Sequence, residues 1–152
     1  MARAPFQVLI YPYRKAIDGR LEYALLKRVD DGLWQAITGG GENQETPLEA
    51  ARRETYEEAG IPAVSYFLHL DTIESVPVVE FRNSAIWGDD IFVIPQHCFG
   101  VETGDTQIVI SREHTEFRWI SYEEARQLLN FTGDKTALWE LDKRLRGRGP
   151  RG

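Results

Sequence analysis

The stretch from Thr38 to Ile61, TGGGENQETPLEAARRETYEEAGI, constrains most strongly what this chain can fold into. Three consecutive glycines lead into a helix pattern. The run Thr46–Glu49 provides an N-cap, a proline at the first helical position and the glutamate of a capping box. Gly60 supplies the left-handed residue with which helices commonly end. The sequence therefore predicts a helix that runs to about Ala59 behind a glycine-rich lead-in.

Glutamates crowd the same stretch, at positions 42, 45, 49, 54, 57 and 58. Because a helix turns about 100° per residue, Glu54, Glu57 and Glu58 span roughly 100° of one helix face. Like charges three and four residues apart repel one another, and carboxylates near the C-terminal end oppose the helix dipole. One interpretation is a solvated acidic face. The other is a site for a hard divalent cation such as Mg²⁺, which prefers oxygen ligands and removes the repulsion.

A second stripe on this helix is apolar. It consists of Leu48, Ala51, Thr55 and Ala59. Such a stripe is expected to face the protein core, beside the glutamates. Ala50 falls within the acidic stripe, where a small side chain leaves space. The three glycines before the helix allow the backbone to approach a ligand closely.

The rest of the chain alternates strand patterns with two further helices. Strands or extended segments are expected at 6–14, 21–29, 33–38, 64–71, 72–81, 91–101, 107–110 and 116–120. The first two form a hairpin around the Asp18-Gly19 turn. Ser121 and Glu124 open a helix to about Leu129, and Asp134 is expected to cap a last helix. This order predicts an α+β fold with a mixed sheet between helices.

Composition places the chain among globular domains of ordinary size. We expect residues 1–146 to form a single domain and 147–152 to form a disordered basic tail. The net charge of −6 argues against binding to a nucleic-acid polymer, which needs Lys and Arg on phosphates. No apolar run approaches the ~20 residues of a membrane span. A lone Cys98 excludes an internal disulfide and fits a reducing cytoplasm.

At this point the central stretch resembles a known family. Gly39, Glu45 and the run Arg53–Ile61, RETYEEAGI, match the Nudix box. That pattern is Gly, five residues, Glu, seven residues, Arg-Glu, an aliphatic residue, any residue, Glu-Glu, any residue, Gly and an aliphatic residue. Thr55 departs from it at the first aliphatic position, which affects packing more than chemistry. The resemblance implies the Nudix fold, an α/β/α sandwich, and Mg²⁺-dependent hydrolysis of a diphosphate linked to another moiety.

The same resemblance implies roles for individual residues. Glu54, Glu57 and Glu58 would be metal ligands, with backbone carbonyls near Thr38 and Gly39 completing the site. Arg53 would support them by pairing with Glu45. The expected cofactor is Mg²⁺, with Mn²⁺ as its alternative.

Two segments outside the box resemble the dihydroneopterin triphosphate pyrophosphatase group. They are 33–39, LWQAITG, and 112–119, REHTEFRW. A further glutamate on the second segment acts as a metal ligand or base in several Nudix enzymes. Glu113 is the matching position and Glu116 is the second choice. His114 adjoins Glu113 and is a candidate to assist it.

The candidates for substrate binding are basic or aromatic. Lys27 or Arg28 is expected to hold a phosphate, and Arg14 is a third candidate at a strand end near the glycines. Trp34 either stacks on a base or pterin ring or fills the core. Cys98 is expected to be a small buried apolar residue.

The sequence thus predicts a cytoplasmic Nudix pyrophosphohydrolase that cleaves a nucleoside or pterin triphosphate to the monophosphate and pyrophosphate. Two rival activities are hydrolysis of a dinucleoside polyphosphate or of ADP-ribose. A rival of another class is a nucleotide sensor without catalysis. Prenyl diphosphate isomerisation is disfavoured, because it needs a reactive cysteine in the site. The expected partner is a small-molecule phosphate compound rather than a nucleic acid or a membrane, and a homodimer is left open.

Overall fold

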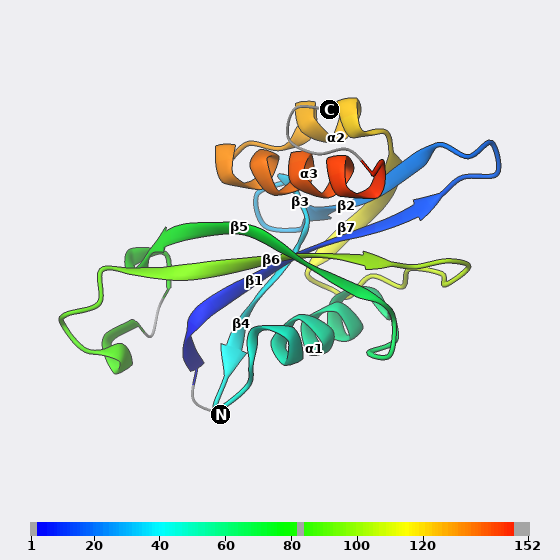
Figure 1. Ribbon diagram of the computed structural model, residues 1–152. Coiled ribbons are helices and arrows are strands. Elements are labelled where there is room, and N and C mark those ends of the chain that lie inside the picture. The colour runs from blue at the N-terminus through cyan, green and yellow to red at the C-terminus, as the bar shows by residue number, and fades with distance from the viewer. Residues whose placement is uncertain (1–2, 82–83, 148–152) are drawn as a thin grey trace.

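The structure is a computed structural model that describes residues 3–81 and 84–147 (Figure 1). Its strands are β1 (Arg3–Lys15), β2 (Leu21–Arg28), β3 (Trp34–Gln35), β4 (Ile37–Glu42), β5 (Phe67–Pro77), β6 (Val93–Glu102) and β7 (His114–Ile120). Its helices are α1 (Pro47–Ala59), α2 (Tyr122–Leu128) and α3 (Thr132–Leu145), with short 3-10 turns η1 (Val78–Glu80) and η2 (Ser84–Trp87).

The strands form one mixed sheet. Its order is β3-β2-β1-β6-β5, with β4 paired to β1 and β7 paired to β2. Strands β1 and β6 run parallel, whereas the other pairs are antiparallel. Strand β1 is shared, because β4 pairs with its first part and β2 with its last. The sheet therefore divides along β1, between the β4 pairing and the β2 pairing.

Helices cover both faces of this sheet. Figure 1 shows α1 on one face and α2 with α3 on the other. On the α1 face, Ala50 and Ala51 pack with Val8 and Ile10 of β1. On the opposite face, side chains of α2 and α3 pack over alternate residues of β1 and β2. The expected α/β/α sandwich with a mixed sheet is confirmed.

Local signals set the ends of α1 as the sequence predicted. Thr46 accepts a hydrogen bond from the Glu49 amide, and the Glu49 carboxylate accepts one from the Thr46 amide. Gly60 adopts the left-handed conformation, and its amide donates to the Tyr56 carbonyl. The apolar stripe faces the core as expected, but Ala50 is also fully buried there. The space expected beside the glutamates is thus occupied by core packing.

Two strand predictions need correction. The segments 64–71 and 72–81 were expected as two strands, but one long strand, β5, spans most of both. A register shift between His69 and Ile73 allows it to continue past the irregularity. The extended segment expected at 33–38 is divided into β3 and β4, and β4 continues through the glycines 39–41.

The prediction that Asp134 caps the last helix is wrong. Helix α3 begins at Thr132 after Phe131, so Asp134 lies inside the first turn. It is buried and shares a side-chain hydrogen bond with Glu74 of β5. The Glu74 carboxylate also accepts a hydrogen bond from the Gln96 amide at 2.7 Å. Burial, followed by the charge of Glu74, raises the pKa of Asp134 to about 8. A carboxyl pair therefore joins α3 to the sheet by sharing a proton.

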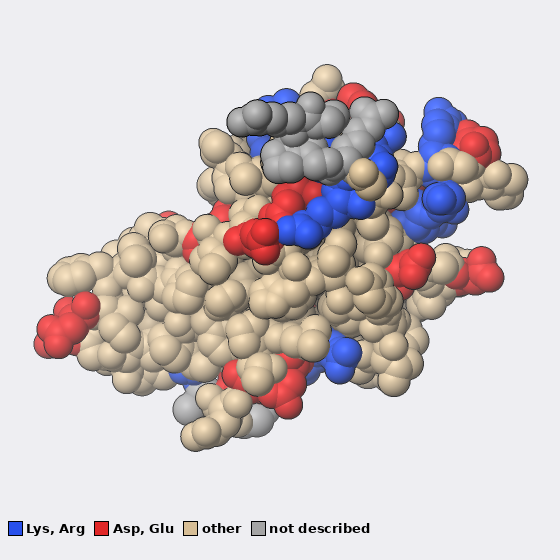
Figure 2. Space-filling model, in the orientation of Figure 1, with Lys and Arg blue, Asp and Glu red and all other residues tan. Residues whose placement is uncertain are grey.

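Several expectations are left as predictions. On the face shown in Figure 2, acidic and basic side chains are interleaved over α3, and few lie over β5 and β6. Ile73 and Val93, in β5 and β6, are among the exposed apolar side chains. The chain's partners and oligomeric state stay predictions.

No helix among the described residues is long and apolar enough to cross a bilayer. Apart from Gly147, the predicted basic tail lies outside the described residues.

The Asp134–Glu74 pair predicts an unusual dependence of stability on pH. The folded chain holds a proton that the unfolded chain releases above its ordinary pKa of 3.8, so stability should fall as pH rises from about 4 to about 8. Asp134→Asn should flatten this slope. Between pH 5 and pH 8 we expect wild type to lose about 2 kcal/mol more than the variant, measured by urea unfolding. The control is Asp105→Asn, at an exposed turn residue. Parallel curves for wild type and Asp134→Asn would refute the shared proton.

Candidate active site

The centre of the site is the contact between β4 and α1. Gly39 faces α1, and a Cβ atom added there would overlap the carboxyl group of Glu54. A larger side chain at this position would displace the Glu54 carboxyl group. Glycine at 39 is therefore needed for close approach, not for an unusual backbone angle.

Arg53 binds the acidic residues of this contact together. Its Nε donates to Glu45 Oε2 at 2.8 Å, and its Nη2 donates to Glu45 Oε1 at 3.0 Å. Nη1 donates to Glu54 Oε1 at 2.9 Å, while Nη2 also donates to the Gly40 carbonyl at 2.8 Å. The expected pair of Arg53 with Glu45 is thus present. These bonds raise the pKa of the guanidinium, mainly through Glu45, and tie α1 to β4.

Three carboxylates converge beside this contact, and we call Glu54, Glu58 and Glu113 the carboxylate cluster. Glu58 is only 4% exposed. Glu54 and Glu113 lie close enough for their charges to act on its carboxyl group. Glu113 lies in the turn just before β7 and is exposed. The cluster thus runs from a buried end at Glu58 to a solvent-facing end at Glu113.

The segment that carries Glu113 is held by the end of α1. The Val109 amide donates to the Ala59 carbonyl at 2.9 Å, and the Ser111 amide donates to the Glu58 carbonyl at 3.2 Å. These carbonyls lie in the last turn of the helix, where intrahelical partners are lacking. On the other side, the Glu113 carbonyl accepts from the Val29 amide at 3.0 Å. The sequence predicted an extended segment at 107–110 but gave no signal of this docking.

The electrostatics of the cluster call for a positive charge. Burial, then Glu54 and then Glu113, raise the pKa of Glu58 to about 9. Burial also raises the pKa of Glu54, against the opposing effect of Arg53. Among the described residues, Glu58 Oε2 is buried without a hydrogen-bond partner. An unpaired, buried oxygen next to two other carboxylates fits a hard cation, because hard cations prefer oxygen ligands.

The cluster does not form a closed metal cage. Within residues 3–81 and 84–147, no three or more carboxylate, imidazole or thiol groups are arranged closely enough to hold an ion by themselves. Mg²⁺ commonly uses one or two carboxylates and fills its remaining positions with water and substrate phosphate. The donor set therefore fits Mg²⁺ as an open site rather than an all-protein one.

The other predicted carboxylates are placed differently. Glu57 is 56% exposed at its side chain and lies 3.4 Å from Arg53. It is adjacent to the cluster and turned toward solvent. Glu116 pairs in register with Lys27, and its carboxylate contacts Arg118 at 3.3 Å. Since Arg118 packs over Trp34 on the α2–α3 side, Glu116 faces away from α1.

The predicted substrate-binding residues divide between the two faces. Lys27 pairs directly with Trp34, so both lie on the α2–α3 face. Arg28 pairs with His114 on the α1 face, where Asp30 and Asp31 hold its guanidinium. Of these residues, Arg28 is the one that the fold brings near Glu113. The pKa of Arg28 is raised mainly by the hydrogen bond to Asp30, and the charge of Glu113 adds a smaller effect.

Arg14 is not near the glycines, as the sequence analysis expected. The β1–β4 register ends at Ile10, and Arg14 pairs instead with Glu22 of β2. Its Nε contacts Glu22 Oε1 at 2.9 Å, and its guanidinium packs over Trp119 at 4.2 Å. Its role in substrate binding stays a prediction.

Arg3 is a neighbour of the site that sequence reasoning missed. A Cβ atom at Gly40 would lie 2.6 Å from Arg3 Cζ, so the guanidinium packs directly on β4. The charge of Glu54 acts on Arg3, and the ring of Phe81 lies 4.6 Å from its guanidinium. No motif marks Arg3, because its position depends on the β1–β4 pairing.

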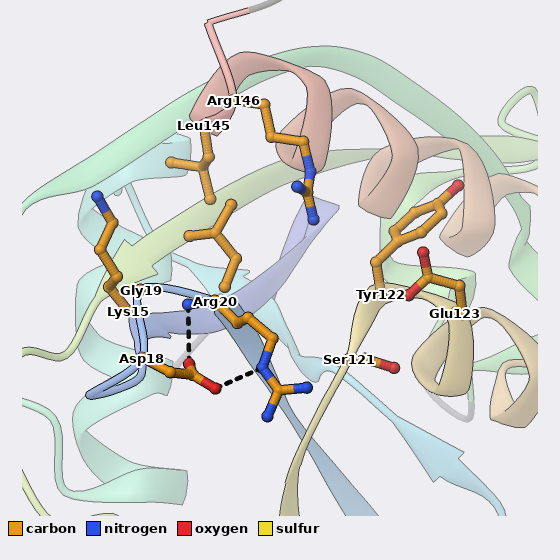
Figure 3. A pocket seen from close by; sticks show the side chains of 10 residues that line it. Lys15, Asp18, Gly19, Arg20, Ser121, Tyr122, Glu123, Leu145 and Arg146 are labelled. Carbon is orange, nitrogen blue, oxygen red and sulfur yellow. Dashed lines mark hydrogen bonds and ion pairs between the residues drawn. The ribbon is translucent and has the colours of Figure 1, made fainter.

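A separate hollow lies at the β1–β2 turn, beside α2 and the end of α3 (Figure 3). It has a volume of about 610 Å³ and contains none of the predicted site residues. Within it, Arg20 contacts Asp18 at 2.6 Å. Arg146 at its rim is held by Asp142 at 2.9 Å. Its charges are thus largely neutralised by their neighbours, and the carboxylate cluster is the better candidate for chemistry.

Comparison with known proteins agrees with this geometry. A family model, the NUDIX domain, matches residues 14–139. The chain belongs to the Nudix family. The resemblance of the 38–61 stretch to the Nudix box is thereby confirmed. The chain is a hydrolase, because it belongs to this family and its similar curated relatives are hydrolases.

Three similar proteins indicate its neighbourhood within the Nudix family. A solved Listeria monocytogenes protein assigned as a NUDIX hydrolase is 36% identical, with a TM-score of 0.85 and coverage of 95% of this chain and 96% of its own. The pig bis(5′-nucleosyl)-tetraphosphatase is 36% identical over 76% of each chain. The dihydroneopterin triphosphate diphosphatase of Haemophilus influenzae is 29% identical over 86% of this chain and 83% of its own.

The Arg53 contacts predict a large loss of stability when this side chain is removed. Arg53→Ala would leave Glu45 and Glu54 without their cation, and we expect the free energy of unfolding to fall by about 2–3 kcal/mol in urea titrations. The matched control is Arg52→Ala. Arg52 is exposed and lies 5.9 Å from the Phe67 ring, so its loss should cost less than about 1 kcal/mol. Equal losses in the two variants would contradict the role of Arg53.

Proposed function

We propose that this Nudix hydrolase is a Mg²⁺-dependent pyrophosphohydrolase that cleaves a nucleoside or pterin triphosphate to the monophosphate and pyrophosphate. The observation that carries the proposal is the carboxylate cluster, in which a Glu58 oxygen is buried without a partner and Glu54 packs against Gly39 of β4. The similarity to a dihydroneopterin triphosphate diphosphatase supports the choice of a triphosphate.

Each residue has a distinct part in this proposal. Glu54 and Glu58 hold the ion from α1, and Glu57 joins them from the exposed side of the same helix turn. When bound, Mg²⁺ supplies Lewis-acid stabilisation of the charge that develops on the phosphoryl oxygens. Glu113, at the solvent-facing end of the cluster, accepts the proton of the attacking water. Arg53 keeps Glu54 in place through its bonds to Glu45 and Gly40.

A second candidate activity is asymmetric cleavage of a dinucleoside tetraphosphate. It is favoured by the 36% identity to the pig bis(5′-nucleosyl)-tetraphosphatase. The cluster would serve either substrate, since both reactions place water on a phosphate anhydride. The two activities differ in what must be held beyond the phosphates, namely one ring or a second nucleoside.

Prenyl diphosphate isomerisation finds no support in the position of Cys98. Its thiol is buried in the cluster of side chains between the sheet and α2–α3, and burial raises its pKa well above the ordinary range. It is thus on the opposite face of the sheet from Glu58. A thiol of this kind is an inert core residue, as the sequence analysis expected.

The proposed function is tested by incubating the protein with a panel of substrates and resolving the products. The panel comprises nucleoside triphosphates, dihydroneopterin triphosphate, diadenosine tetraphosphate and ADP-ribose, each with Mg²⁺ and with EDTA. We expect pyrophosphate and a monophosphate from a triphosphate, and activity near background in EDTA. Release of ATP and AMP from diadenosine tetraphosphate alone would instead establish the second candidate. Turnover that persists in EDTA would contradict the proposed dependence on Mg²⁺.

The fold also predicts which glutamate of the 112–119 segment takes part in catalysis. Glu113→Gln should lower kcat by about 10²–10³-fold, because it removes a proton acceptor beside Glu58. The matched control is Glu116→Gln, three residues away on the opposite face, which should stay within about threefold of wild type. Initial rates at saturating substrate measure both. A larger loss in Glu116→Gln than in Glu113→Gln would reverse the assignment.

A further inference from the structure

A buried histidine joins the two sequence segments outside the Nudix box to Glu58. Gln35 comes from the LWQAITG segment and His114 from the REHTEFRW segment. Their side chains meet at 3.3 Å, between Gln35 Nε2 and His114 Nε2. The other ring nitrogen of His114, Nδ1, lies 3.9 Å from Glu58 Oε1. The three side chains therefore form a line from β3 to the buried end of the carboxylate cluster.

The contact with Gln35 determines where the imidazole carries its proton. An amide nitrogen donates hydrogen bonds and does not accept them, so His114 Nε2 must be the acceptor. In a neutral imidazole, the proton then resides on Nδ1. This places an N–H group opposite Glu58.

The two facing groups have unmet bonding capacity. Among the described residues, His114 Nδ1 and Glu58 Oε2 are both buried without a hydrogen-bond partner. The side chains are 1% and 6% exposed, respectively, so solvent has little access to either. The terminal torsion of a glutamate is broad, and a rotation of the carboxylate can shorten the 3.9 Å separation to a hydrogen bond. The Glu58 oxygen nearest to Nδ1 is Oε1 rather than the unpaired Oε2. Without such a rotation the Nδ1–H group would stay buried without an acceptor, which is costly.

We propose that Gln35 and His114 are positioning residues, in which Gln35 sets the tautomer of His114 and His114 Nδ1–H holds the Glu58 carboxylate for a divalent cation. The proposal rests on the proposed function for its use of the cation. It gives Gln35 and His114, one from each outer segment, a shared role. Partners of ligating carboxylates commonly change metal affinity or activity by 10–100-fold when they are removed.

Burial of His114 favours its neutral form over the cation. Burial lowers its pKa, and Arg28 across the strand pair acts in the same direction. The carboxylates of Glu113 and Asp30 oppose this effect but are secondary to burial. A neutral donor orients Glu58 without competing with a cation for its charge. A histidine that merely fills the core would have no such requirement for the Nδ1 proton.

Two amide substitutions distinguish a positioning role of His114 from a role in filling the core. The side-chain nitrogen of asparagine can occupy the place of Nδ1, whereas that of glutamine reaches the place of Nε2. His114→Asn therefore keeps a donor toward Glu58, and His114→Gln moves it to the wrong end. We expect Mn²⁺ affinity, measured by electron paramagnetic resonance, to stay within about threefold of wild type in His114→Asn and to weaken about 10–100-fold in His114→Gln. Thermal unfolding of both variants controls for folding.

A spectroscopic test needs neither a substrate nor a metal. Long-range ¹H–¹⁵N correlation spectra distinguish the two imidazole tautomers. Because the chain has only 3 histidines, the signals of His114 are assigned as those that are absent from the spectrum of His114→Asn. We expect the Nδ1–H tautomer in the wild type and a mixture or the Nε2–H form in Gln35→Leu. An Nε2–H tautomer in the wild type would overturn the proposal.

The outcomes distinguish this inference from the proposed function. The expected tautomer and the Asn–Gln difference in Mn²⁺ affinity would support the positioning role even if no substrate of the panel were hydrolysed. Equal Mn²⁺ affinities in His114→Asn and His114→Gln, or no Mn²⁺ binding by the wild type, would overturn it even in an active enzyme.

Discussion

The site depends on one guanidinium placed among carboxylates. Arg53 joins Glu45, Glu54 and the Gly40 carbonyl through hydrogen bonds of 3.0 Å or less. It thereby connects the lead-in turn, the helix and strand β4. Without it, carboxylates that are largely removed from solvent would face one another uncompensated, which is a costly arrangement. The helix can carry its glutamates because its own Arg neutralises one end of the group and leaves the other end for a cation.

The acidic and apolar stripes of α1 turn out to be parts of one packed interface. Ala50 and Ala51 lie in the core, and Glu58, about two turns later, is buried as well. Close packing brings Glu58 to the segment at 107–113, which donates hydrogen bonds to the last helix carbonyls and carries Glu113. The core contacts that hold the helix therefore also set the distances within the carboxylate cluster. A change in core packing at α1 is therefore expected to alter the distances between the carboxylates of the cluster.

Side-chain alternation in the strands separates residues that are close in sequence and were expected to lie together in the site. Lys27 and Arg28 are neighbours in sequence, yet they lie on opposite faces of the sheet, with only Arg28 beside Glu113. Glu113 and Glu116 separate in the same way. Arg14 is removed from the glycines because the β1–β4 pairing ends before it. These differences come from register and from which face each strand buries, and neither is visible before the strands are paired.

The sequence by itself determined α1, its capping box and its terminal glycine, because these depend on local signals and on short-range periodicity. The order of elements indicated a mixed sheet, and the resemblance to the Nudix box supplied the family and the α/β/α arrangement. It also marked Glu54, Glu58, Glu45, Arg53 and Gly39, which lie close together along β4, the turn after it and α1. Only the tertiary structure decided that β5 is one strand, that Asp134 is buried against Glu74, and that Arg3 and Gln35 lie near the site. These features depend on contacts between residues far apart in the chain. The 38–61 stretch thus carries its own geometry, whereas the groups that complete it are selected by the sheet.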